Sequence, residues 1–183
     1  SFDELHAVNP DVCGWVTLDG TQIDYPVLQG ETNLSYINTD VYGNFALAGS
    51  IYIDCRNSRD FSDFYNLLFG HHMANSRMFG DLDLYKNEDF FRSNTTGTLL
   101  TESAVYDLNV VALLLVPASE KRIFDITLFG SADDVISFVQ ENAVYMNGKM
   151  PKSGDGIRFL AFSTCSSEYT DARTVLITTM TRY

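Results

Sequence analysis

The stretch SAVYDLNVVALLLV, residues 103–116, is the longest β-type run in the sequence. Its second half, residues 110–116, is apolar without polar alternation, which predicts a strand buried on both faces. Shorter β-type runs lie on either side of it, at residues 14–18, 23–28, 50–54, 66–72, 98–101, 157–162 and 175–180. Together these runs predict a mostly β domain of about eight strands, with helices inserted between them.

The clearest helix signal begins at Ser131, where a second acceptor side chain three residues later has the spacing of a capping box. An apolar stripe follows, and Gly148 fits the left-handed position after a helix of about four turns. A shorter helix is expected after Ser58, with Tyr65 on its apolar face, and a helical turn is expected at residues 87–92.

Composition limits the function classes. The 183 residues carry 12 basic and 24 acidic side chains, a formal net charge of −12, with no basic stripe. A chain this acidic is repelled by phosphate backbones, which excludes nucleic acid as a partner. Hydrophobic residues make up 45% of the chain, enough for a real core, so residues 1–183 are expected to form one domain. No apolar stretch reaches the roughly 18 residues that span a bilayer.

Three cysteines, at positions 13, 55 and 165, stand at wide and irregular spacing. Their odd number argues against a disulfide scaffold, and the absence of C-x-x-C or a His-rich run argues against zinc. Structural roles are favoured for Cys13 and Cys55, which could pair only if the fold made them neighbours. Cys165 differs, because it lies where an apolar strand gives way to a polar loop, a place suited to a nucleophile.

A catalytic thiol needs a cationic or hydrogen-bonding neighbour, because a free cysteine is mostly protonated at neutral pH. His71 and His72 follow a predicted strand, and Arg173 begins the strand after Cys165, where it could bind a carbonyl or an oxyanion. Each residue also has a plainer interpretation. Cys165 could be a small buried hydrophobe, the His pair a surface turn, and Arg173 a solvated strand flank.

Four ordered motifs favour the catalytic interpretation, because together they resemble the signature of sortases, and of class B sortases in particular. The motifs are LFGHHM (68–73), MFGDL (78–82), FSTC (162–165) and Arg173. Two further segments support the match, NPDVCGW (9–15) and GSIYID (49–54), so the resemblance covers nearly the whole chain. It implies an eight-stranded β-barrel with an N-terminal helical segment and a long helix between strands six and seven.

The resemblance also implies residue roles. Cys165 would be the nucleophile, His71 the acid and base, and Arg173 the anchor of substrate and oxyanion. His71 is preferred to His72 because family members with one imidazole keep it directly after the glycine, and His72 would point to the opposite face.

Three further residues are expected to bind substrate. Ser163 and Thr164 would line the groove. Ser166 would lie there too, at a position where some class B enzymes carry an acidic side chain.

The implied reaction is transpeptidation of a C-terminal sorting signal resembling NPxTx or LPxTx, through a thioester at the Thr carbonyl. The partners would be surface proteins or pilins that bear the signal, and an amine acceptor from the cell-wall precursor, lipid II, or from a pilin lysine. No cofactor or metal is expected. The resemblance places the enzyme on the outer face of a Gram-positive cell membrane, with a single N-terminal anchor missing from this sequence.

Two alternatives remain from the residues themselves. A cysteine peptidase of another type would hydrolyse peptides without an amine acceptor. A non-catalytic β-rich surface or adhesin module would keep Cys165 buried.

Overall fold

The computed structural model describes residues 1–164 and 171–183. The described strands are β1 (Val12–Leu18), β2 (Asp24–Leu28), β3 (Ile51–Ile53), β4 (Tyr65–Gly70), β5 (Thr96–Leu100), β6 (Val105–Pro117), β7 (Ala143–Met146), β8 (Arg158–Thr164) and β9 (Ala172–Arg182). The described helices are α1 (Phe2–Val8), the 3-10 helix η1 (Gly80–Lys86), α2 (Glu88–Ser93), α3 (Lys121–Phe124) and α4 (Ala132–Asn142). None of these helices has the length and apolarity to cross a bilayer.

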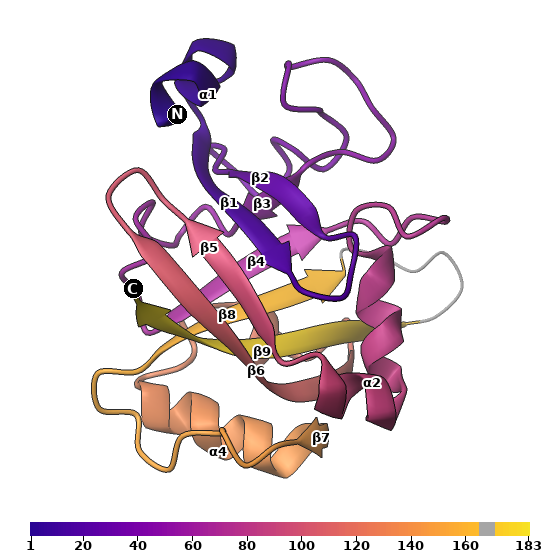
Figure 1. Ribbon diagram of the computed structural model, residues 1–183, viewed down its shortest axis with the longest axis vertical. Helices are drawn as coiled ribbons and strands as arrows, with labels where there is room; N and C mark the ends of the chain where they lie inside the picture. Colours follow the sequence, from indigo (N-terminus) through magenta and orange to yellow (C-terminus); the bar gives the residue numbers. More distant parts are fainter. Residues whose placement is uncertain (165–170) are drawn as a thin grey trace.

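Eight of these strands close into a barrel, as predicted. Their order is β5-β1-β2-β3-β4-β8-β9-β6, and the ring is completed by the pairing of β5 with β6. The remaining strand, β7, adds to β6 outside the ring. The pairs β2–β3 and β4–β8 are parallel, so β4 and β8 run side by side to the same end of the barrel (Figure 1).

The longest strand, β6, is buried on both faces over residues 110–114, and the sequence prediction is confirmed there. Val110 and Leu113 point into the barrel core, whereas Val111, Ala112 and Leu114 pack in a second core that includes α4. A register shift between Val110 and Ala112 puts two successive residues on the α4 side. Two apolar faces explain why the run lacks polar alternation.

The N-terminal helix and the long helix between the sixth and seventh barrel strands are both present. Ser1 caps α1 in a capping box with Glu4. Ser131 caps α4 by accepting a hydrogen bond from the backbone N–H of Asp134. Figure 1 shows α4 and β7 together on the outside of the barrel.

The predicted extent of the long helix is wrong at its C-terminal end. The helix ends at Asn142, and the next four residues form β7, with Tyr145 opposite Leu113 and Met146 opposite Ala112 of β6. Gly148 therefore does not terminate the helix, and its φ is not among the positive ones. The free edge of β6 lets this segment pair as a strand at three positions, which local sequence cannot indicate.

The predicted helix after Ser58 is also absent, because residues 58–64 form turns and Tyr65 already belongs to β4. Phe61 has a φ of 61° and is fully buried in the barrel core. Ser58 donates its hydroxyl hydrogen to Asp63 and does not cap a helix. The expected helical turn at residues 87–92 is confirmed, since Asn87 caps α2.

Candidate functional site

Three adjacent strand ends bring together the described residues that the sequence singled out. In the parallel β4–β8 ladder, Gly70 lies opposite Thr164. In the antiparallel β8–β9 ladder, Ser163 lies opposite Val175, and the Thr174 backbone N–H donates to Thr164 Oγ1 at 3.3 Å. The residues that follow β4 and begin β9 therefore lie on either side of the end of β8.

Close packing at the end of β4 favours glycine at position 70. A Cβ there would lie 2.5 Å from Ile51 Cδ1 and 2.7 Å from the ring of Phe79. Phe79 is fully buried and packs on Phe162 of β8, with ring centroids 5.7 Å apart. The Gly-His motif, the MFGDL motif and the FSTC motif thus meet in one packed cluster, which explains why they occur together in the sequence.

The two imidazoles go to different partners. His71 is half-buried, and its Nε2 lies 2.5 Å from the backbone oxygen of Ile37. His72 is more exposed, and its Nε2 lies 2.5 Å from Asp83 Oδ2 in η1. Burial opposes ionisation of Asp83, but hydrogen bonds from Lys86 and His72 lower its pKa below 3.8. His72 is thereby held in a surface charge cluster on η1.

Arg173 is half-buried at the start of β9, where it lies opposite Val116 of β6. It borders a hollow of about 210 Å³, called here the Arg173 hollow, which is lined by Phe69, Ala118, Phe124, Thr164 and Arg173. Among the described residues, no carboxylate pairs with its guanidinium. A guanidinium bordered mainly by apolar groups can donate N–H hydrogen bonds to a substrate carbonyl or to an oxyanion.

The predicted substrate residues differ in their positions. Thr164 borders the Arg173 hollow, whereas Ser163 is fully buried and donates its hydroxyl hydrogen to the Thr164 backbone oxygen at 3.2 Å. Cys165 and Ser166 lie outside the described residues.

Sequence reasoning missed several groups at this site. Phe69 has a local signal, because it directly precedes the Gly-His motif. Ala118 and Phe124 come from the connection after β6 and carry no such signal. Ile37 contributes only a backbone oxygen, which no side-chain pattern reveals.

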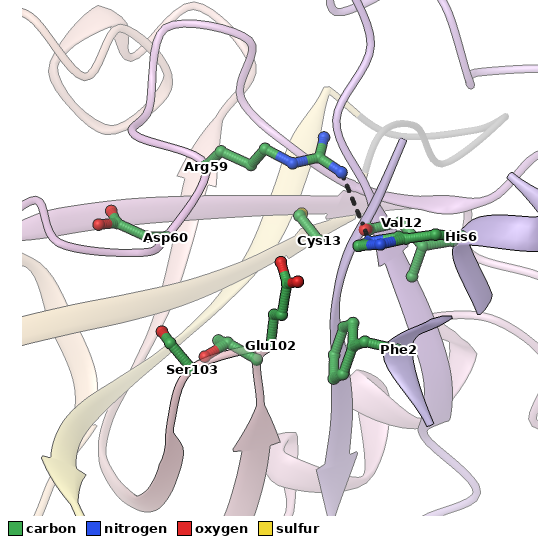
Figure 2. A pocket seen from close by; sticks show the side chains of 9 residues that line it. Phe2, His6, Val12, Cys13, Arg59, Asp60, Glu102 and Ser103 are labelled. Atoms are coloured by element: carbon green, nitrogen blue, oxygen red, sulfur yellow. Dashed lines mark hydrogen bonds between the residues drawn. The ribbon is translucent and has the colours of Figure 1, made fainter. Parts of the chain in front are cut away.

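A second hollow, of about 200 Å³, lies elsewhere on the barrel, beside the start of β1 and the β5–β6 turn. Arg59 and His6 both reach the backbone oxygen of Val12, at 3.0 and 2.9 Å (Figure 2). Their polar atoms are thus engaged in holding the chain before β1. Cys13 is buried beside this hollow, and burial raises the pKa of its thiol to about 12.

Cys13 and Cys55 are both free thiols, so the possible pairing between them is not formed. Across the described residues, no group of three or more His, Cys, Asp or Glu side chains is arranged to hold a metal ion.

Comparison with known proteins gives consistent matches. No protein-family model matches the chain. Sortase B of Listeria monocytogenes is 30% identical over 169 residues, which span 90% of this chain and 67% of that protein. Sortase B of Staphylococcus aureus is 29% identical over 172 residues, which span 93% of this chain and 69% of that protein.

Solved structures agree. A Streptococcus pyogenes class B sortase involved in pilus biogenesis matches with a TM-score of 0.88 and 34% identity, over 99% of this chain and 98% of that one. The Staphylococcus aureus sortase B–substrate complex matches with a TM-score of 0.87 and 27% identity, over 99% of this chain and 84% of that one.

Proposed function

This chain belongs to the sortase B family and is a cysteine transpeptidase, and we propose that Cys165 is its nucleophile, His71 its acid and base, and Arg173 its oxyanion anchor. One observation carries the assignment, the register of the three strand ends. Gly70 is opposite Thr164, and His71 and Cys165 are the residues that directly follow these two in the sequence. Val175 is opposite Ser163 in the β8–β9 ladder, and Arg173 lies two residues before Val175, at the start of β9.

The spacing of neighbouring strands supports cooperation between these groups. Adjacent strands lie about 4.8 Å apart, within the reach of an imidazole or a guanidinium. His71 after β4, Cys165 after β8 in the sequence, and Arg173 in β9 would supply a proton carrier, a thiolate and a fixed cation.

The chemistry follows from these groups. The thiolate attacks the Thr carbonyl of the sorting signal, and Arg173 donates hydrogen bonds to the oxyanion that forms. Collapse of this intermediate breaks the peptide bond, and the leaving amine takes a proton from His71. A thioester remains. An incoming amine attacks it and gives a proton to His71, which restores the starting thiolate and imidazolium.

For the substrate, we propose a sorting signal of the NPxTx or LPxTx type on a surface protein or pilin. The acceptor would be an amine of lipid II or a pilin lysine. The pilus role of the Streptococcus pyogenes relative supports the pilin option. We also propose that the enzyme acts on the outer face of a Gram-positive membrane, held by an N-terminal anchor. Fractionation of cells that express the full-length gene would test this location.

The test uses both peptide types, each with and without a short amine acceptor, and follows products by mass spectrometry. A transpeptidase yields a ligated product when the amine is present. Hydrolysis alone, unchanged by the amine, would support the other type of cysteine peptidase. No turnover of any peptide together with an unreactive Cys165 would support the non-catalytic surface module.

Substitutions test the proposed roles of His71 and Arg173. His71→Ala is expected to lower kcat/KM by about 10²- to 10⁴-fold, since it removes the proton carrier. Arg173→Ala is expected to lower it by about 10²- to 10³-fold, since it removes oxyanion donors. His72→Ala is the matched control and should stay within about twofold, because His72 pairs with Asp83 on the surface. A loss in His72→Ala equal to that in His71→Ala would contradict the assignment of His71.

A further inference from the structure

The short contact between His71 and the backbone of Ile37 determines where the imidazole proton lies. His71 Nε2 is 2.5 Å from the Ile37 oxygen, across 34 residues of sequence. A carbonyl oxygen can only accept a hydrogen bond, so Nε2 must carry a hydrogen. In the neutral ring the lone pair is then on Nδ1.

We propose that the Ile37 carbonyl is a positioning group for catalysis: it holds His71 in the Nε2–H tautomer, so that Nδ1 is the nitrogen that gives and takes the proton. The proposal rests on the assignment of His71 as acid and base. In the protonated ring, Nδ1–H donates to the leaving amine, and the Nε2–H bond to Ile37 persists before and after. The carbonyl takes no part in the proton transfer.

The Ile37 carbonyl is itself fixed from the β3 side of the molecule. Gly49 has a φ of 59°, and a Cβ on it would lie 2.4 Å from the Ile37 oxygen and 2.7 Å from the Tyr36 oxygen. Directly before β3, the Ser50 backbone N–H donates to the Tyr36 oxygen at 3.1 Å, and its hydroxyl donates to the Thr39 oxygen at 2.7 Å. Because Gly49 packs closely against this backbone directly before β3, the position of β3 fixes the position of the Ile37 carbonyl oxygen.

An acceptor that fixes the tautomer has a kinetic consequence. In the serine-protease triad, the wrong histidine tautomer costs about 10⁴ in kcat. A neutral carbonyl holds the ring less strongly than that carboxylate, so we expect a smaller but clear loss when the Ile37 oxygen is displaced. The loss should fall on kcat, because the tautomer matters for proton transfer and not for peptide binding.

The first test uses the wild-type chain. Long-range ¹H–¹⁵N NMR separates the two tautomers of a neutral histidine, and the three histidines can be assigned with His6→Gln and His72→Gln variants. In the neutral ring, observed at alkaline pH, we expect a hydrogen on Nε2 and a bare Nδ1. A His71 ring that carries its hydrogen mainly on Nδ1, or that populates both tautomers equally, would overturn the proposal.

The second test compares two glycines of the same connection. Gly49→Ala places a methyl group against the Ile37 oxygen, whereas Gly43 has a φ of 80° and a Cβ on it would meet nothing within 4 Å. Both substitutions strain a left-handed residue, and only one displaces the acceptor. We expect Gly49→Ala to lower kcat at least about tenfold with KM nearly unchanged, and to raise the Nδ1–H population of His71. Gly43→Ala should keep kcat within about twofold.

The outcomes separate this inference from the proposed function. If His71→Ala keeps full turnover, the assignment of His71 fails. If His71→Ala is inactive but Gly49→Ala has normal kcat and the wild-type tautomer, only the role of Ile37 fails. If circular dichroism shows that Gly49→Ala does not fold, the wild-type NMR measurement decides alone.

Discussion

Burial distinguishes the described cysteines from one another. Cys13 is 6% exposed, and its Sγ donates to the Val27 oxygen at 3.5 Å. Burial raises the pKa of this thiol to about 12, so the thiol is almost entirely protonated at neutral pH. Cys55 is only half-buried and free. A neutral, enclosed thiol is a poor nucleophile, which agrees with the structural role expected for Cys13.

Alkylation measures this difference. With iodoacetamide at pH 8, Cys55 should be modified in the native protein, whereas Cys13 should react only after unfolding in urea. Peptide mapping by mass spectrometry gives the rate at each position, and the unfolded sample is the control. Native Cys13 that reacts as fast as Cys55 would contradict the buried, neutral assignment.

At the residue scale, the strand ends next to His71, Thr164 and Arg173 are neighbours in the barrel, as the order of the motifs suggested. The catalytic and binding roles of these residues stay predictions. The contribution of Ile37 could not be predicted, because a backbone carbonyl has no signature in the sequence and its partner is 34 positions away.

Among the elements, β6 and α4 show what periodicity can predict. The apolar run of β6 has two buried faces, one toward the barrel core and one toward α4, and both faces follow from its lack of polar alternation. The start of α4 was predicted correctly from its Ser131 cap. Its end was not, because AVYM at residues 143–146 suits either a helix stripe or a short strand, and only the open edge of β6 decides between them.

The prediction of a helix after Ser58 was wrong for a related reason. Aromatic residues at helical spacing suggested a short helix, but Phe61 enters the barrel core through a left-handed backbone conformation. A helix at this point would not place the Phe61 ring in the barrel core.

For the molecule as a whole, the Arg56–Asp54 pair links three segments that are distant in the sequence. Arg56, just after β3, binds Asp54 through Nε and Nη2, both at 2.9 Å, and binds Asp125 after α3 through Nη1 at 2.8 Å. Asp54 is fully buried and also accepts from Asn33 at 3.0 Å, in the connection that carries Ile37. Hydrogen bonds to Asp54 are the main cause of the raised pKa of Arg56.

The two carboxylates bound by Arg56 should differ in their effect on stability. Asp54→Ala is expected to lower the free energy of unfolding by about 3 kcal/mol, because Arg56 and Asn33 lose the fully buried carboxylate that accepts their hydrogen bonds. Asp125→Ala, the matched control, is expected to cost at most about 1 kcal/mol, since that side chain is 38% exposed. Urea unfolding gives both values. Equal losses in the two variants would contradict the view that the buried Asp54 carboxylate holds these segments together.

The central claim is that Cys165 forms the acyl-enzyme, and intact-mass and peptide-mapping mass spectrometry test it most directly. The enzyme is mixed with a sorting-signal peptide in the absence of an amine acceptor. We predict an adduct on Cys165 whose mass equals the peptide up to and including its Thr residue, minus one water. The adduct should be absent in Cys165→Ala and present in Cys55→Ala. An adduct on any other residue, or turnover retained in Cys165→Ala, would contradict the account.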